Sequence, residues 1–340
     1  MNIFITGATG FIGQNFIQSH FQSFDTIFTL VRENSLKKAT QMFKKIPNVN
    51  YIVGDITHNN ICKHQEDFNL IVNEVHSILN LAGQYQLDIS VTDAYFHNII
   101  GMQNIIFLAQ KMKYLEFFHH ISTYAVRTNE GSETFPDNYC KSKKQGEDIF
   151  AKASLPNIKK RIYRPGIVIG SSQTGSISKI DGPYFFLQFL QKIESLLPTI
   201  QKLGFFPFPF DPQATFPIIP VDTLCYWLKE ALTSPSLKGE LKVYNFLFKD
   251  NIHIESFIKA SLNFHNINVP ILKMKNRGLY KFVLPQLGLP RQTLHYLFSK
   301  TSFDMSQRKI DFPHFKDLDF KDYQDIFYSG FQQHTQRSHS

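Results

Sequence analysis

The feature that most constrains this chain is a glycine-rich segment between an expected strand and an expected helix. Residues 2–6 (NIFIT) form a short apolar run, residues 6–13 read TGATGFIG, and residues 11–22 repeat apolar positions at helical spacing. A turn in this context leaves the first N–H groups of the helix free to bind an anion. The segment therefore predicts a phosphate-binding turn at the start of an α/β domain.

The three glycines of this turn have separate roles. Gly7 permits the tight turn, Gly10 lets a pyrophosphate approach the backbone, and Gly13 lets the helix pack on the strand. Their spacing is G-x-x-G-x-x-G, which differs from the G-x-G-x-x-G of many dinucleotide sites. The residues that we expect to contact a dinucleotide here are Gly7, Thr9, Gly10, Phe11, Ile12 and Gly13.

Strand-like and helical patterns alternate over the first half of the chain. Further apolar runs lie at 26–31, 50–53, 77–82, 116–121 and 161–164, and helical patterns lie at 93–111 and 138–153. Such alternation is typical of a parallel sheet with helices on both faces, and these sheets bind ligands at the carboxyl ends of their strands. We therefore expect an α/β fold with a Rossmann-type doubly wound parallel sheet.

The chain is too long for one compact domain of ordinary size. Its 340 residues favour a Rossmann domain over residues 1–170 and a smaller substrate-binding lobe over residues 171–335. Parts of 216–250, notably the strand-like residues 216–219 and 242–247, are expected to return to the first sheet.

The second half is expected to mix irregular and helical segments. Prolines and phenylalanines recur through residues 195–220, and this density of proline is expected to exclude a helix and most strands there. Helical patterns return at 222–233, 254–264 and 292–300. The polar residues 334–340 are expected to fray.

Composition and charge narrow the class of protein. No stretch approaches the roughly 18 apolar residues of a spanning helix, and the N-terminus lacks the basic region and cleavage site of a secretory signal. Cys62, Cys140 and Cys225 are far apart and odd in number, which argues against a disulfide framework or a metal site and favours a reducing, cytoplasmic setting. The net charge of +8 is scattered in small groups, so we expect an anionic cofactor and no nucleic-acid partner.

The end of the second expected strand bears on the choice of cofactor. An acidic residue at this point would bind the adenosine ribose hydroxyls, whereas an arginine suits a 2′-phosphate. Arg32 stands there, with Glu33 after it, so we expect NADP(H) rather than NAD(H). The expected cofactor contacts at the ends of the third and fourth strands are Asp55, Ile56, Ala82 and Gly83.

A group of polar residues has the chemistry of a proton-transfer site. Tyr139 and Lys143 lie four residues apart on an expected helix, hence on one face, and an ammonium beside a phenol lowers the phenol pKa. The phenol then exchanges a proton near neutral pH. Ser122 and Thr123 end another expected strand, where a hydroxyl can hold a substrate oxygen. Asn98 is expected to anchor a water that relays protons to Lys143.

Other polar residues near these positions are expected to be structural. His119 and His120 precede Ser122 on the strand, so at least one of them is expected to be a packed core residue. Cys140 lies beside Tyr139, yet a catalytic thiol needs a nearby histidine base, and the sequence shows none. We therefore expect no nucleophilic cysteine.

Taken in order, these motifs resemble the extended short-chain dehydrogenase/reductase family. The matching segments are TGATGFIG (6–13), the Asp55 turn, NLAG (80–83), HNIIG (97–101), ISTYAV (121–126), YCKSK (139–143) and RPGIVIG (164–170). The likeness runs from residue 2 to about residue 250. It implies that Thr123 supplies the catalytic hydroxyl with help from Ser122, and that Pro165 and Gly166 meet the nicotinamide carboxamide.

Within that family the chain is most similar to the fatty acyl-CoA and thioester-reductase-like branch, also called male-sterility-type. The similar segments are 170–175 (GSSQTG), 179–184 (KIDGPY), 217–224 (PIIPVDTL) and, more weakly, 301–309 (TSFDMSQRK). The branch implies an NADPH-dependent reductase of an acyl thioester or the related aldehyde. Thr123 and Tyr139 would then bind the developing oxyanion, and Lys143 would also hold the nicotinamide ribose.

The expected substrate contacts are supported by fewer sequence features than the cofactor contacts. They are Ser122, Gln84, Tyr184, Phe206 and Phe208. Residues 205–216 place five phenylalanines among prolines, which admits two accounts. The rings either pack a loop onto the fold, or they line an acyl channel or rest on a membrane surface that supplies the substrate.

Other functions remain open on the same scaffold. A sugar-nucleotide epimerase or dehydratase would favour an acid after the second strand, which Arg32 opposes. A non-catalytic NADP-binding sensor often lacks the tyrosine or the lysine, and this chain has both. Steroid-like alcohol dehydrogenation is a further alternative, and acyl chain length, reaction direction and the choice between monomer and homodimer stay undetermined.

Overall fold

The computed structural model describes residues 1–84, 88–126, 135, 137–234, 239–274, 277–300 and 302–337. The chain forms two compact units, each assembled from three stretches of sequence. The first unit comprises Met1–Pro165, Asp222–Phe246 and Met305–Phe315, and the second comprises Gly166–Val221, Leu247–Asp304 and Lys316–Ser340. Segments from the second half of the sequence therefore complete the first unit.

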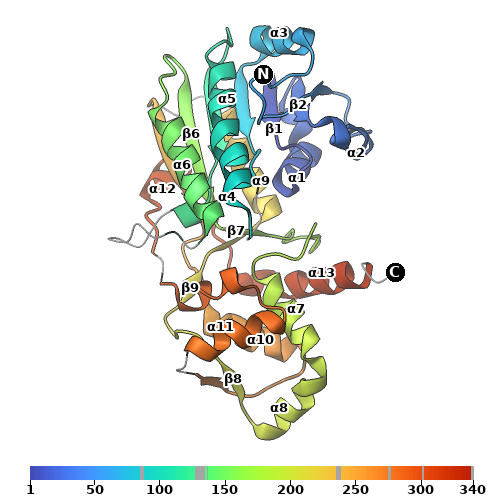
Figure 1. The fold of residues 1–340 in the computed structure, drawn as a ribbon, viewed down its shortest axis with the longest axis vertical. Helices are drawn as coiled ribbons and strands as arrows, with labels where there is room; N and C mark the ends of the chain where they lie inside the picture. The colour runs from blue at the N-terminus through green and yellow to red at the C-terminus, as the bar shows by residue number, and fades with distance from the viewer. Residues whose placement is uncertain are drawn as a thin grey trace. The chain divides into compact units, whose positions relative to one another are not determined.

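A seven-stranded parallel sheet forms the centre of the first unit (Figure 1). Its strands are β1 (Ile3–Thr6), β2 (Ile27–Val31), β3 (Val49–Val53), β4 (Ser77–Asn80), β5 (Phe117–Ile121), β6 (Lys159–Pro165) and β11 (Leu241–Phe246). They are arranged in the order β11-β6-β5-β4-β1-β2-β3, and every neighbouring pair is parallel. The predicted α/β doubly wound fold is confirmed.

Helices cover both faces of this sheet (Figure 1). They are α1 (Phe11–His20), α2 (Leu36–Met42), α3 (Gln65–Glu74), α4 (Val91–Tyr95), a π-helical segment (Phe96–Ile100), α5 (Gly101–Ala109), α6 (Asn138–Lys152), α9 (Val221–Thr233) and α12 (Ser306–Asp311). Phe4 and Phe118 of the strands pack with Ile105 of α5 and Phe150 of α6 in one buried cluster. Burial of such side chains is worth about 1.5–3 kcal/mol each, which holds α5 and α6 on the sheet.

The strand order places the ligand-binding edge of the sheet. The chain runs outward from β1 through β2 to β3 and then crosses back to β4 on the other side of β1. The carboxyl ends of β1 and β4 therefore form a topological switch point, which is where open parallel sheets bind their ligands. The glycine-rich turn follows β1 at this edge.

The C-terminal part of the first unit covers its edge strand, β11. Lys242 Nζ and the Tyr244 hydroxyl of β11 both donate hydrogen bonds to Asp311 of α12, over 2.6 and 2.7 Å. The guanidinium of Arg308 lies 4.8 Å from the ring centre of Trp227 in α9. A covered edge strand is protected from pairing with another chain.

The second unit is built from short elements around an aromatic core. Its strands are β7 (Ile167–Ile169), β8 (Phe206–Phe208), β9 (Thr215–Phe216), β10 (Ile218–Pro220), β12 (Ile252–His253) and β13 (Ile271–Lys273). Its helices are α7 (Tyr184–Lys192), α8 (Leu197–Leu203), α10 (Ile254–Phe264), α11 (Arg277–Gln286) and α13 (Gln324–Arg337). Strand β7 pairs with β10 and β8 with β13 in parallel, whereas β9 pairs with β12 in the antiparallel direction.

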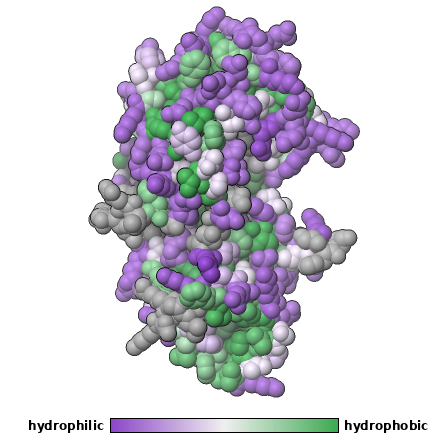
Figure 2. All heavy atoms as spheres, in the orientation of Figure 1, coloured by the Kyte–Doolittle hydropathy of each residue, from purple (hydrophilic) through white to green (hydrophobic). Residues whose placement is uncertain are grey.

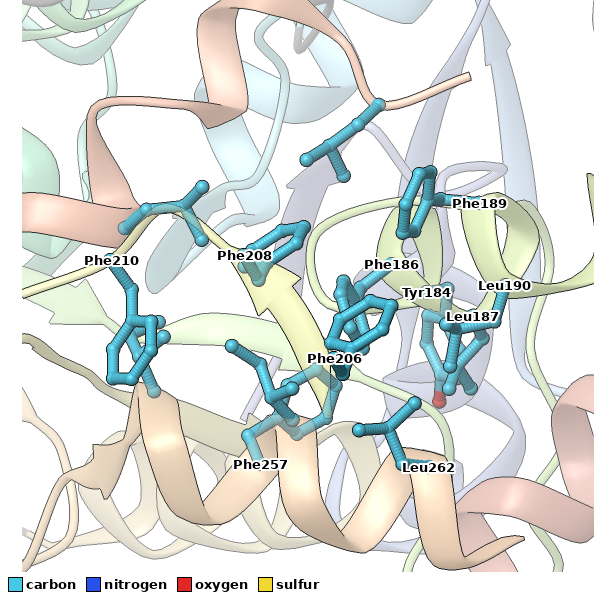
Figure 3. Close-up of a cluster of buried hydrophobic side chains, with 14 of the residues drawn as sticks. Tyr184, Phe186, Leu187, Phe189, Leu190, Phe206, Phe208, Phe210, Phe257 and Leu262 are labelled. Atoms are coloured by element: carbon cyan, nitrogen blue, oxygen red, sulfur yellow. The ribbon is translucent and has the colours of Figure 1, made fainter. Parts of the chain in front are cut away.

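Rings from α7, β8 and α10 meet in the core of this unit (Figure 3). The ring centres of Phe186 and Phe208 lie 5.3 Å apart, and those of Phe206 and Phe208 lie 5.7 Å apart. Tyr184 stacks on Phe327 of α13 at 4.5 Å. The high phenylalanine content of the chain therefore has a packing explanation in this unit.

Several predicted elements of the second half are corrected by the structure. Residues 242–247 do return to the first sheet through β11, but 216–219 do not, because β9 and β10 find their partners in the second unit. Residues 195–220 do contain a helix, α8, since Pro198 lies in its first turn, where the N–H that proline lacks is not needed.

Two predictions near the C-terminus, one of a helix and one of frayed residues, are also corrected. Residues 292–300 form two short 3₁₀ turns, Arg291–Thr293 and Tyr296–Phe298, in place of an α-helix. Residues 334–337, which were expected to fray, continue α13, and Phe327 and Phe331 of that helix are buried. Residues 338–340 lie outside the described part of the chain.

The crossing of α13 with residues 171–176 generates a prediction about stability. A methyl group on Gly330 would lie 1.9 Å from the carbonyl oxygen of Gly175, a backbone atom that cannot easily move. We expect Gly330→Ala to lower the free energy of unfolding by about 1–3 kcal/mol, measured by urea denaturation. Gly204→Ala is the comparison without a clash, because a methyl group added there has no atom within 4 Å, so that its only cost is the backbone strain at φ +77°. Equal losses in the two variants would contradict the steric explanation.

Candidate active site

The glycine-rich turn has the geometry of a phosphate cradle. Gly7 has φ +72°, and a Cβ there would lie 2.8 Å from backbone atoms of Leu81 and Ala82. A Cβ on Gly13 would lie 2.4 Å from the Gly7 carbonyl oxygen, so both positions require glycine. Gly10 is exposed, and the nearest atom to an added Cβ is 3.1 Å away, which leaves its outer side open to a ligand.

The start of α1 is suited to an anion. No side chain caps its first N–H groups, and its first turn carries no acidic residue. Free N–H groups and the helix dipole together favour a phosphate. Thr9, Phe11 and Ile12 lie in or beside this turn, as predicted from the sequence. The residues present therefore fit the pyrophosphate of a dinucleotide.

A buried chain of hydrogen bonds fixes the strands around this turn. The Ala82 N–H donates to Thr6 Oγ1 over 3.1 Å, and the Thr6 hydroxyl donates to Asn80 Oδ1 over 2.6 Å. Asn80 Nδ2 in turn donates to His120 Nδ1 over 3.2 Å. His120 can accept only as a neutral imidazole. Burial, and then the charge of Lys143, hold its pKa well below the ordinary value, so the chain of bonds persists at neutral pH.

The end of β2 presents a basic side chain to solvent. Arg32 is exposed, and among the described residues no carboxylate pairs with it. Glu33, the acid that follows, forms an ion pair with Lys63 at 2.6 Å. At the end of β3, the Asp55 carboxylate accepts two hydrogen bonds of 2.9 Å from the N–H and hydroxyl of Thr57. Ile56 beside it is buried.

One hydrogen bond brings the predicted catalytic residues together. Lys143 Nζ on α6 donates to the Ile121 carbonyl oxygen over 2.7 Å, at the carboxyl end of β5. The next residues along the chain are Ser122 and Thr123, both buried. Tyr139 lies one turn before Lys143 on the same face of α6. The hydrogen bond therefore brings the tyrosine–lysine pair of α6 next to Ser122 and Thr123 at the end of β5.

The hydroxyls at the end of β5 differ in their partners. Thr123 Oγ1 accepts a hydrogen bond from the Ala125 N–H over 3.3 Å. Ser122 Oγ is buried and has no hydrogen-bond partner within the described part of the chain. A buried hydroxyl without a partner costs free energy, which a bound oxygen at this point would recover.

The ammonium of Lys143 lies in an environment that opposes its charge. Burial lowers its pKa from 10.5 to about 8, and Glu147 opposes this change. Glu147, one turn further along α6, is itself buried and forms a two-pronged ion pair with Arg164, with Nε to Oε2 at 3.0 Å. Glu147 therefore bonds directly to Arg164 and acts on the Lys143 ammonium only through its charge.

Asn98 ties three segments together at this site. It lies in the π-helical segment between α4 and α5, a feature that often marks functional positions. Its Oδ1 accepts from the Gln84 N–H over 3.2 Å, and its Nδ2 donates to Ser142 Oγ over 2.9 Å. A Cβ on Gly83 would lie 3.0 Å from Asn98 Oδ1 and 3.6 Å from Lys143 Nζ. The predicted residues Asn98, Gly83 and Lys143 are therefore neighbours.

The remaining predicted substrate residues belong to the second unit and are core residues there. Tyr184, Phe206 and Phe208 are almost completely buried (Figure 3), and the Tyr184 hydroxyl accepts a hydrogen bond from the Gly170 N–H over 3.0 Å. Their burial favours the packing account over an acyl channel. Gly166 also belongs to the second unit, whereas Pro165 ends β6 in the first.

Sequence reasoning missed the residues that support Lys143. Glu147 follows Lys143 by four residues on one helix, so its spacing was a usable signal for a carboxylate beside the lysine. Its pairing with Arg164 of β6 carries no local signal. His119 and His120 are both buried, as expected of at least one, and burial raises the pKa of the Cys140 thiol far above its ordinary value. The described residues contain no grouping that could hold a metal ion.

Comparisons with known proteins agree with this geometry. Residues 5–227 match the family model described as male sterility protein, an NAD-binding family. Fatty acyl-CoA reductase 1 of Mus musculus is 27% identical over 142 residues, which is 36% of this chain and 28% of that protein. This chain therefore matches only about a quarter of the length of that curated relative.

Solved structures show the same fold at low identity. The terminal R domain from the myxalamid PKS-NRPS biosynthetic pathway superposes with a TM-score of 0.76 at 17% identity, covering 98% of this chain and 91% of that one. UDP-glucuronic acid 4-epimerase from Bacillus cereus, in complex with UDP-glucuronic acid and NAD, superposes with a TM-score of 0.68 at 18% identity, covering 98% and 99%. At these identities the likeness is one of fold.

The family model spans more than half of the chain and includes the glycine-rich turn, the end of β5 and the tyrosine–lysine pair of α6. The chain belongs to the male sterility protein family of NAD(P)-dependent oxidoreductases, a branch of the extended short-chain dehydrogenases/reductases.

Proposed function

We propose that this protein is an NADPH-dependent reductase of an acyl thioester, either a fatty acyl-CoA or a carrier-bound acyl group, or of the related aldehyde. The observation that carries the proposal is the 2.7 Å bond from Lys143 to Ile121, which joins the Tyr139–Lys143 face of α6 to Ser122 and Thr123. The names of the relatives, an acyl-CoA reductase among them, support this class of substrate.

Each residue of the site has a separate role in the proposed reduction. NADPH, when bound, would supply the hydride for the carbonyl carbon of the substrate. An aldehyde would become an alcohol, and a thioester would become a hemithioacetal that loses its thiol to give the aldehyde. The hydroxyls of Thr123 and Tyr139 hold the carbonyl oxygen, and Tyr139 gives its proton to that oxygen as negative charge grows there. The Lys143 ammonium favours the phenolate that remains on Tyr139.

Ser122 and Asn98 support this arrangement. Ser122 Oγ offers the substrate oxygen a further donor from a buried position. The Asn98 side chain holds the Gln84 backbone and Ser142, and so keeps the ends of β4 and α6 in register. Gly83 leaves space beside Lys143 where the nicotinamide ribose would lie.

The preference for NADP(H) rests on Arg32. Its exposed guanidinium follows β2, and the neighbouring Glu33 is engaged by Lys63. A guanidinium forms strong, two-pronged hydrogen bonds with a phosphate, whereas a ribose hydroxyl gains little from it. Asp55, Ile56 and Ala82 would contact the adenine side of the same cofactor.

The proposed reaction is tested by NADPH oxidation with a panel of acyl-CoAs, fatty aldehydes and nucleotide sugars. We expect oxidation with acyl-CoAs or aldehydes and none with nucleotide sugars. Tyr139→Phe should lower kcat by at least about 100-fold, because the proton donor is lost. NADPH affinity should change by less than about twofold, because the ring still fills its place. Wild-type turnover in Tyr139→Phe would contradict the mechanism, and activity on nucleotide sugars alone would contradict the substrate class.

Cofactor choice is tested at Arg32. We expect Arg32→Ala to weaken NADPH binding by about tenfold or more, which is the value of a charge-assisted phosphate contact, and to leave NADH binding unchanged. Fluorescence titration of the two reduced cofactors measures both affinities. Lys45→Ala is the control, since Lys45 is also exposed and lies between α2 and β3. Equal wild-type affinities for NADPH and NADH would exclude the assignment.

The charge of Lys143 is tested by the pH dependence of stability. Its pKa of about 8 in the folded protein lies below the ordinary 10.5, so between these values the unfolded chain binds more protons. The free energy of unfolding should therefore rise with pH over this window. The stability gained by Lys143→Met should be larger at about pH 7 than at about pH 9.5 by about 2 kcal/mol.

Urea denaturation of wild type and Lys143→Met at both pH values measures this difference, because all other titrating groups are shared. Lys141→Met is the matched control, since Lys141 is an exposed lysine on the same helix. A difference that does not vary with pH would mean that Lys143 is not forced to carry its charge in a dry environment.

A further inference from the structure

We infer that one end of the second unit, formed by α8, β8, β13 and α11, binds an anionic lipid surface. This inference concerns residues that the proposed reaction does not use. It also replaces the sequence-based expectation for Phe206 and Phe208, whose rings point into the core (Figure 3). The side chains available to a membrane are their exposed neighbours.

Large apolar side chains stand exposed on these elements. Leu203 ends α8 with 60% of its surface exposed, and Phe282 of α11 is 66% exposed. The other exposed apolar residues here are Phe205, Leu272 and Val283. Hydrophobic residues gather over the α8 and β8 end of the unit (Figure 2). Most large apolar side chains of this unit are buried, so this group is unusual for a surface.

The exposed apolar residues of α8, β8 and β13 belong to one surface. In the β8–β13 pair, Leu272 lies opposite Pro207, and both are exposed. Phe205 directly precedes β8, and the Asn268 N–H donates to Gln201 Oε1 over 3.1 Å, which joins the end of α8 to the segment before β13. Helix α11 follows β13 after residues 274–276.

Basic side chains accompany this apolar group, and acidic ones are nearly absent from its sequence. Residues 268–291 contain no aspartate or glutamate, and residues 192–207 contain only Glu194. The exposed bases on the described elements are Lys192, Lys202, Lys273, Lys281 and Arg291. The Arg291 guanidinium lies 5.9 Å from the ring centre of Phe282, so charge and ring occur together.

This combination fits an anionic bilayer better than a folded protein partner. Exposed apolar side chains can enter the headgroup region, while neighbouring lysines and arginines pair with lipid phosphates. A protein partner would instead need a continuous complementary surface with a dry centre. We therefore commit to an anionic membrane as the occupant, bound through Leu203, Phe205, Leu272 and Phe282 with the neighbouring bases.

The test is co-sedimentation of the whole chain with vesicles, and it requires no turnover. We expect binding to phosphatidylcholine vesicles that contain phosphatidylserine, and weak binding to pure phosphatidylcholine. Each base near such a surface is worth roughly fivefold in affinity, so Lys202→Glu/Lys273→Glu should weaken binding by at least about tenfold. Leu203→Ser/Phe282→Ser should also weaken binding, and added salt should not restore it.

The control surface is on the first unit, where Lys111 lies over the exposed ring of Phe107 at 5.2 Å. Phe107→Ser/Lys111→Glu removes one exposed ring and reverses one charge on this surface, and it should leave vesicle binding unchanged. Unfolding temperatures show that each variant is folded. No binding to anionic vesicles, or equal loss in the control variant, would overturn the inference.

A separate arm distinguishes a protein partner. Binding of poly-L-glutamate through Lys202 and Lys273, without binding to vesicles, would assign the surface to an acidic protein and overturn the lipid proposal. Because the assay reads binding alone, its failure would leave the proposed reductase activity standing. Failure of the reductase assay would likewise leave vesicle binding as a separate result.

Discussion

A buried ammonium is the constraint on which the active site depends. Lys143 carries its charge inside the first unit, where burial lowers its pKa to about 8. A charge in such a place must be stabilised by dipoles or by an opposite charge. Here the Ile121 carbonyl accepts a hydrogen bond from Lys143, and the charge of Glu147 favours the protonated lysine. Those two partners lie on β5 and on α6. The same interaction that makes the charge tolerable therefore also fixes the helix that bears Tyr139 against the strand that leads to Thr123.

The buried charge of Lys143 also affects the protonation of the neutral residues near it. His120 lies close enough for the Lys143 charge to lower its pKa, and it stays neutral and accepts a hydrogen bond from Asn80. Asn80 Oδ1 accepts a hydrogen bond from the Thr6 hydroxyl, which in turn accepts one from the Ala82 N–H in the turn after β4. A second cation at His120 would reverse the donor at its Nδ1 and break the chain of bonds. The phosphate turn and the proton-transfer site are thus coupled through one buried polar network, which tolerates a single positive charge.

The sequence predicted best those features that depend on local pattern. The glycine-rich turn, the strands of the first sheet and the Tyr139–Lys143 face all have short-range signals: a required conformation at Gly7, apolar runs and a four-residue spacing. The pairing of Glu147 with Arg164 has no such signal, because the two residues are 17 positions apart and meet only through packing. For the same reason β10 was misassigned, since an isolated apolar run does not say which sheet it joins. A helix tolerates proline in its first turn, and Pro198 occupies that position in α8. The density of proline around it gave no indication of where the helix would begin.

The phenylalanine content shows what composition alone does not predict. Some of the rings are buried in a core and others are exposed. In β8 the side chains alternate, so that Phe206 and Phe208 enter the core while Pro207 faces outward. Composition alone does not say which side chains of a strand point into the core and which point outward, because that depends on the register of the strand. With the register known, the abundance of rings is explained by the core of the second unit. The residues left to explain are the few that remain exposed outside this core. Packing accounts for the buried rings, so the proposed membrane contact concerns only exposed side chains such as Phe205 and Phe282.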